Sequence, residues 1–149
     1  MAEYSFEIDT ELPTLNKYIN IERTNKYLAA KEKERFTNIC MLFIMEQLKG
    51  FRLDKLYDVH IIWNVPNERE DADNIYFGVK FILDGLCEAE KTYKFLPNKK
   101  KPVIDKHGIL YSDGRKNIRH IYNEIYTGDK YLVTVTLKEV NIDTHKLYF

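Results

Sequence analysis

The stretch 57–65 constrains the fold of this chain more than any other, because its side chains alternate in polarity. Successive side chains of a β-strand point to opposite faces, so this alternation predicts a strand with one buried face. Residues 66 and 67, Pro and Asn, then end the strand and leave 69–73 as a loop at its carboxyl end. The apolar positions of the strand are Tyr57, Val59, Ile61, Trp63 and Val65.

Asp71 and Asp73 lie in that loop, one residue apart. In extended backbone such side chains point the same way, and two adjacent carboxylates repel each other unless a cation lies between them. Mg²⁺ is commonly held by one or two carboxylates, with water and substrate phosphates completing its shell. An apolar helical pattern follows from Asn74 to Leu86, so the pair lies at a strand-to-helix junction, where open sheets often bind ligands.

The alternative interpretation of this segment is structural. Asp73 or Asn74 could serve only as the N-cap of the following helix, which is a common role for both residue types. A cap accounts for one acidic residue but not for the second. A third carboxylate from elsewhere would complete a phosphodiester-cleaving site, and Asp113 is the candidate.

Asp113 lies in a basic part of a chain whose net charge is zero. Residues 91–120 contain nine Lys and Arg against two Asp, a net charge of +7, while the rest of the chain carries −7. A segregated basic segment is a candidate phosphate-binding surface, although a solvated lysine-rich loop would have the same composition. The candidate DNA-binding side chains in it are Lys99, Lys100, Lys101, Arg115 and Lys116.

The remaining patterns predict a single α+β domain over residues 1–149, with a small mixed sheet and two helices. Residues 15–21 are expected to be a connection and 91–106 a loop. Residues 118–126 also fit a helix, but a turn at 127–129 favours a strand. The expected order is β-α-β-α-(loop)-β-β, with strands at 4–8, 57–65, 118–126 and 131–137 and helices at 25–48 and 74–86.

Several classes of protein are disfavoured by the sequence. The longest apolar run, 39–45, is too short to span a bilayer, and the first residues lack the basic flank and apolar core of a signal peptide. Cys40 and Cys87 lie in apolar helical patterns and are expected to stay reduced. We therefore expect a cytoplasmic protein with no membrane partner. Phosphate loops, zinc-ligand spacings and calcium loops are absent from the sequence.

Four short segments of the sequence, taken in order, match a known pattern. Together they extend over nearly the whole chain. Residues 12–18 read Leu-Pro-Thr-Leu-Asn-Lys-Tyr, and 71–74 read Asp-Ala-Asp-Asn. Residues 80–86 have the form Lys-x-x-x-Asp-x-Leu, and 108–113 have the form Gly-apolar-apolar-x-Ser-Asp. This set resembles the RusA family of Holliday-junction resolvases, which are small endodeoxyribonucleases common in phages and prophages.

The resemblance implies a function and a set of roles. It implies a structure-specific endodeoxyribonuclease that resolves Holliday junctions by paired nicks, in DNA recombination and repair inside a bacterial or phage-infected cell. It implies that Asp71, Asp73 and Asp113 bind Mg²⁺, with Mn²⁺ as a substitute, and that Lys80 acts with them in catalysis. It further implies a homodimer and branched DNA, the four-way junction above all, as the partner.

The chain departs from the family pattern at three places. About three extra residues separate Asn74 from Lys80, nearly one helical turn. Ser112 stands where the family has the first acid of a pair. The segment before Asp71 contains only Arg69 as a basic candidate for DNA contact, so we expect 91–106 to supply the missing charge. The alternative functions are a non-catalytic DNA-binding or structural protein of the same fold, and a soluble interaction module.

Overall fold

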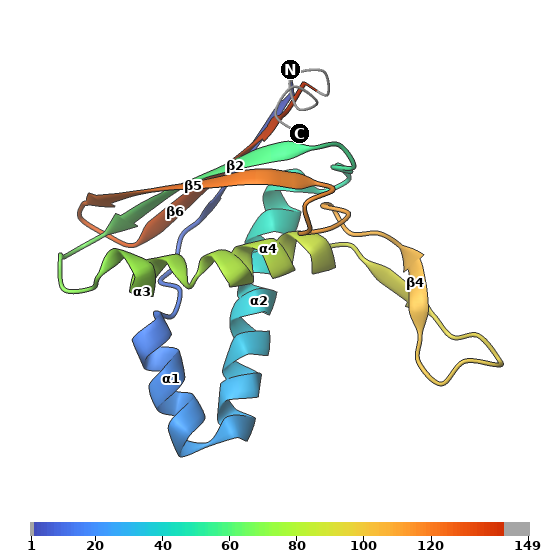
Figure 1. Cartoon of the computed structure of the whole chain (residues 1–149), viewed down its shortest axis with the longest axis horizontal. Coiled ribbons are helices and arrows are strands. Elements are labelled where there is room, and N and C mark those ends of the chain that lie inside the picture. Colours follow the sequence, from blue (N-terminus) through green and yellow to red (C-terminus); the bar gives the residue numbers. More distant parts are fainter. Residues whose placement is uncertain (1, 142–149) are drawn as a thin grey trace.

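The computed structural model describes residues 2–141 and has a mixed sheet covered by helices on one face (Figure 1). Strand β6 pairs antiparallel with both β1 and β2, and β5 pairs parallel with β2, so the order across the sheet is β1-β6-β2-β5. The predicted α+β class is confirmed. The strands of this sheet are β1 (Glu3–Ile8), β2 (Tyr57–Val65), β5 (Ile118–Thr127) and β6 (Leu132–Glu139).

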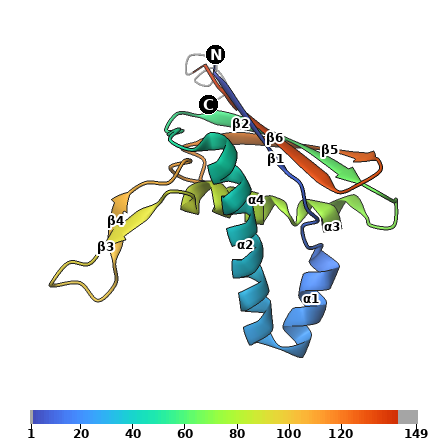
Figure 2. The same ribbon diagram turned by 180° about the vertical axis from the view of Figure 1, so that it is seen from behind.

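The helices form two pairs with different relations to the sheet. Figures 1 and 2 show α3 and α4 lying along one sheet face, while α1 and α2 extend away from it. The carboxyl-terminal part of α2 packs against both α4 and β1. The bounds of the helices are α1 (Leu15–Thr24), α2 (Lys26–Leu48), α3 (Ala72–Tyr76) and α4 (Val79–Glu88).

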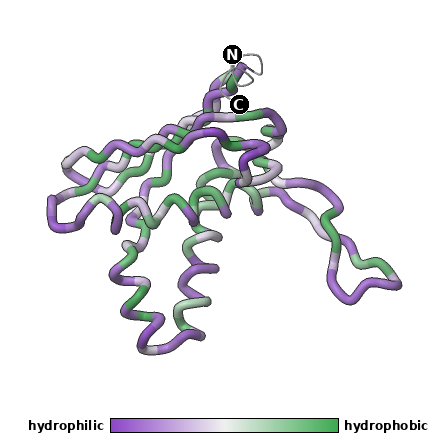
Figure 3. The backbone as a smooth tube through the Cα atoms, in the orientation of Figure 1, coloured by the Kyte–Doolittle hydropathy of each residue, from purple (hydrophilic) through white to green (hydrophobic). Residues whose placement is uncertain are grey.

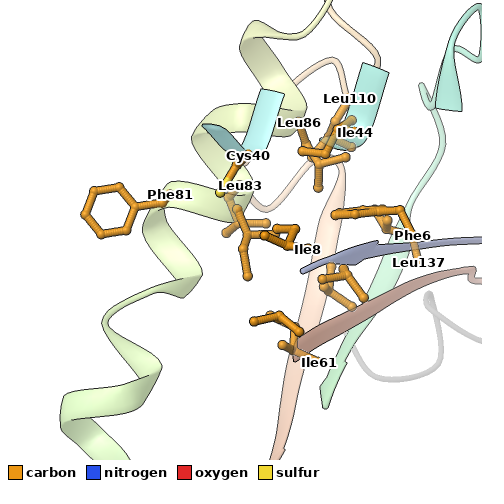
Figure 4. Close-up of a cluster of buried hydrophobic side chains, with 14 of the residues drawn as sticks. Phe6, Ile8, Cys40, Ile44, Ile61, Phe81, Leu83, Leu86, Leu110 and Leu137 are labelled. Atoms are coloured by element: carbon orange, nitrogen blue, oxygen red, sulfur yellow. The ribbon is translucent and has the colours of Figure 1, made fainter. Parts of the chain in front are cut away.

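The hydrophobic core lies between the covered sheet face and helices α2 and α4 (Figure 4). The alternation predicted for 57–65 is confirmed, since Tyr57, Val59, Ile61 and Trp63 are each at most 3% exposed. The side chains that meet them include Phe6 and Ile8 of β1, Ile44 of α2, Leu86 of α4 and Leu137 of β6.

The helical expectations were wrong at two places. Residues 15–21, expected as a connection, belong to α1, which begins after Thr14 because the Thr14 hydroxyl accepts from the Lys17 N–H at 3.4 Å. The helix expected at 74–86 is two helices, separated at Phe77 and Gly78. Gly78 lies against the Trp63 ring, where a Cβ atom would come within 2.8 Å of the ring.

The second half of the chain also differs from expectation. The loop expected at 91–106 contains a hairpin of β3 (Thr92–Lys94) and β4 (Val103–Lys106), which projects from the body in Figure 1. The turn at 127–129 joins two strands, as expected, but β5 and β6 are not neighbours, because β2 lies between them. The strand expected at 118–126 rather than a helix is confirmed as β5.

Both cysteines are free thiols, as the sequence predicted. Burial raises the pKa of Cys40 and of Cys87 to about 12, so both thiols stay protonated near neutral pH. Within residues 2–141, no helix is both long enough and apolar enough to cross a bilayer.

Gly108 fixes the segment that leads to Asp113 against the end of α4. The Ile109 N–H donates to Ala89 O and the Leu110 N–H donates to Leu86 O, each at 3.0 Å. A Cβ atom on Gly108 would lie 1.9 Å from the Cys87 carbonyl oxygen, a contact that only backbone movement can relieve.

We therefore expect Gly108→Ala to lower the free energy of unfolding by about 2–3 kcal/mol. Chemical denaturation would measure the change. Gly128→Ala is the matched control, because its Cβ would meet only Asn64 Oδ1 at 3.8 Å. Equal stability of the two variants would contradict this packing of Gly108.

Candidate functional site

Three charged side chains share one side of the α3–α4 segment. Phe77 and Gly78, between the two helices, keep right-handed helical backbone angles, so the chain continues in nearly the same direction. Spacings of seven and four residues therefore place Asp73, Lys80 and Asp84 on roughly the same side. At 1.5 Å per residue, Lys80 lies about 10 Å along the axis from Asp73 and about 6 Å from Asp84.

Asp71 and Asp73 lie at the start of α3, and neither side chain caps the helix. Asp71 has the N-cap position, with extended backbone, but its side chain makes no capping hydrogen bond. Asp73 Oδ1 accepts from the adjacent Asn74 N–H at 3.1 Å, and both carboxylates are exposed. The alternative in which Asp73 or Asn74 is the N-cap is therefore wrong. The two carboxylates remain accessible to a ligand.

Asp113 lies near Asp84, at the other end of α4. The docking of Ile109 and Leu110 on the last turn of α4 positions this part of the chain. Burial raises the pKa of the Asp84 carboxyl, and the nearby Asp113 carboxylate raises it further, whereas two lysine side chains oppose the shift. Asp84 and Asp113 therefore lie close enough for their carboxylates to repel each other.

The lysines that oppose this repulsion are Lys33 of α2 and Lys80 of α4. The Lys80 ammonium group lowers the pKa of Lys33, burial adds to that decrease, and Asp84 acts in the opposite direction. Lys33 also lines an open groove of about 450 Å³ between α2 and Glu88. Lys33 of α2 and Lys80 of α4 thus lie near Asp84, where α2 packs on α4.

The sequence analysis did not select Asp84 or Lys33 as site residues. The signal for Asp84 was present, because a residue four positions after Lys80 lies on the same helical face. No sequence signal identified Lys33, since only the packing of α2 on α4 brings it to this position.

The structure does not bring Asp113 together with Asp71 and Asp73. Asp71 follows the last residue of β2, whereas Asp113 precedes β5, whose first residue is paired with the first residue of β2. The two ends of this nine-residue strand are roughly 26 Å apart. Metal–oxygen bonds in Mg²⁺ sites are about 2.0–2.1 Å long, so a single ion would need all three carboxylates to converge on one point. Among residues 2–141, no three His, Cys, Asp or Glu side chains converge on one point.

The basic candidates also fall in separate places. Arg69 lines a cavity of about 250 Å³ at the end of β2, which Trp63 and Tyr131 help to form. Arg115 and Lys116 are exposed in the turn before β5, on the side of Asp113. Lys99, Lys100 and Lys101 lie near the tip of the β3–β4 hairpin. Of the basic candidates, Arg115 and Lys116 therefore lie on the side of Asp113, whereas the three lysines near the hairpin tip project away from the body (Figure 1).

Comparison with known proteins gives no independent assignment. No protein-family model matches the chain, and no curated protein matches it.

Proposed function

We propose that this protein is a Mg²⁺-dependent endodeoxyribonuclease that makes paired nicks in branched DNA, as a Holliday-junction resolvase does. The observation that carries the proposal is the position of Lys80 on the α3–α4 face. Lys80 follows Asp71 and Asp73 along this segment and precedes Asp84, whose carboxylate lies near that of Asp113. Carboxylates that can bind a cation, on the same side of a helical segment as an ammonium group, are suited to phosphodiester chemistry.

Each acidic pair supplies the number of carboxylates with which proteins commonly hold Mg²⁺. Asp71 and Asp73 would hold the ion that the family resemblance implies, and Asp84 and Asp113 offer the same donor set. An ion held by these residues would lower the pKa of a water molecule and neutralise charge on the phosphate. Lys80 would orient the scissile phosphate and stabilise the negative charge that develops on it. Mn²⁺ has the same preference for oxygen ligands, so we expect it to substitute.

The activity is tested with a synthetic four-way junction. We expect Mg²⁺ and Mn²⁺ to support symmetric nicks in two opposing strands, and EDTA to abolish them. A linear duplex of the same sequence is the matched control and should stay intact. Junction binding without nicks in either metal would indicate the non-catalytic alternative. The absence of any junction binding would contradict both the nuclease and the non-catalytic DNA-binding protein, and would favour an interaction module.

We expect junction binding to weaken steeply with salt, because lysines near the hairpin tip would contact phosphates. Each neutralised phosphate contributes a slope of about −0.9 in log K against log salt. Replacing Lys99, Lys100 and Lys101 with Ala should therefore flatten the slope by about 2–3, measured by fluorescence anisotropy. The control replaces the exposed Lys26, Lys31 and Lys49 with Ala, and this variant should keep the wild-type slope. An unchanged slope in the first variant would mark the cluster as a solvated loop.

We expect the protein to be a homodimer in solution, because a four-way junction has two-fold symmetry and needs two active sites. Strands β1 and β5 are the edges of the sheet and are the candidates for pairing, whereas β6 is internal. Light scattering should give about twice the chain mass of 17.8 kDa at micromolar concentration. A monomer that still makes paired nicks would contradict this prediction.

A further inference from the structure

The β3–β4 hairpin, residues 92–106, carries a large apolar side chain in a strongly basic setting. Phe95 is 82% exposed, the highest value among the exposed large hydrophobic side chains of the described residues. Residues 92–106 contain five lysines and one aspartate. Figure 3 shows short hydrophobic stretches among hydrophilic ones on this projecting hairpin. An exposed Phe between lysines has no packing role within residues 2–141, so its environment points to a ligand.

The hairpin is an ordered projection with a fixed base. Tyr93 Oη donates to Glu88 Oε2 at 3.1 Å, and the Lys91 ammonium group, 3.3 Å from Glu88 Oε1, lies over the Tyr93 ring. A turn beyond Phe95 is closed by the Lys99 N–H, which donates to Leu96 O at 3.2 Å. Phe95 therefore lies directly after β3, between this strand and the turn.

The hairpin is also adjacent to the charged site in the chain. It starts four residues after the end of α4, which carries Lys80 and Asp84, and it ends two residues before Gly108, where the segment to Asp113 docks on α4. The base of the hairpin therefore lies next to the end of α4 and to the segment that leads to Asp113.

We propose that Phe95 is a wedge that stacks on an unpaired or weakly stacked base at the branch point of DNA. The inference rests on the proposed function and specifies how its substrate is selected. Proteins that bend DNA insert Phe or Leu side chains between base steps while nearby cations bind phosphates. Unstacking costs least where bases are already poorly stacked, so the wedge selects a branch over continuous duplex. DNA fits this surface better than a protein partner because lysines flank Phe95 on both sides of the turn.

The test is a comparison of affinities for a four-way junction and for a linear duplex, measured by anisotropy in EDTA so that no cleavage occurs. Stacking of one base on an aromatic side chain is lost on truncation, so Phe95→Ala should weaken junction binding roughly tenfold and leave duplex binding unchanged. Phe95→Trp should retain the preference for the junction. Leu42→Ala is the matched control, since Leu42 is 69% exposed on α2.

The outcomes separate this inference from the proposed function. Wild-type affinity of Phe95→Ala for the junction, in a protein that nicks junctions, would overturn the wedge and leave the nuclease intact. Equal weakening on junction and duplex would also overturn it, because Phe95 would then contribute to general DNA binding. If the wild-type protein binds neither DNA, both the wedge and the proposed function fail.

Discussion

Asp73→Asn is expected to lower junction cleavage by roughly three orders of magnitude. Asparagine keeps the shape of the side chain but removes the charge that would hold Mg²⁺ beside Asp71. Junction affinity without metal should hold or rise, because an ionised carboxylate repels DNA phosphates and an amide does not. The fold should survive, since the only hydrogen bond of the Asp73 carboxylate shown among the described residues is to the neighbouring Asn74 N–H. Single-turnover cleavage, anisotropy and thermal unfolding measure these three effects.

Asp129→Asn is the control for this change, because Asp129 is an exposed aspartate in the turn between β5 and β6. It should cleave at the wild-type rate. A large fall in melting temperature for Asp73→Asn, with binding and cleavage lost together, would show that Asp73 is structural after all. Retained cleavage in Asp71→Asn and in Asp73→Asn would remove this pair from the site.

Asp113→Asn is expected to lower cleavage at least 100-fold, and Asp84→Asn by a similar factor. The reason is that these two carboxylates lie close enough to repel each other, and we expect a bound cation to need the charge of both. The double variant should then be no worse than the single variants, which is the non-additivity of residues that act as a unit. The measurement is the cleavage rate at saturating enzyme and Mg²⁺.

The contrast between Asp84 and Asp113 also tests the separation of the two acidic pairs. If Asp113→Asn is inactive and Asp84→Asn is fully active, Asp113 acts with Asp71 and Asp73, and bound DNA brings together ends that the structure keeps apart. If both single variants cleave normally, the Asp84–Asp113 pair has no catalytic role.

Local patterns determined the elements whose side chains repeat with a clear period. The alternation in 57–65 predicted β2 at the observed bounds, because a strand with one face against the core must repeat every two residues. The long helix predicted at 25–48 is α2, which begins at Lys26 because Asn25 Oδ1 accepts from the backbone N–H groups of Tyr27 and Leu28. The structure leaves Asp71 and Asp73 exposed, and the roles assigned to this pair and to Lys80 stay predictions.

Tertiary packing determined which strands and which site residues are neighbours. Strand β6 enters the sheet between β1 and β2 rather than beside β5, and sequence periodicity carries no information on strand neighbours. The parallel pairing of β2 with β5 separates Asp113 from Asp71 and Asp73. The resemblance carried by the motifs had implied that these three aspartates bind metal together. Docking of the Gly108 segment on α4 places Asp113 near Asp84 instead, through backbone hydrogen bonds between residues twenty or more positions apart. Such contacts depend on the whole folded chain, so only the structure could supply them.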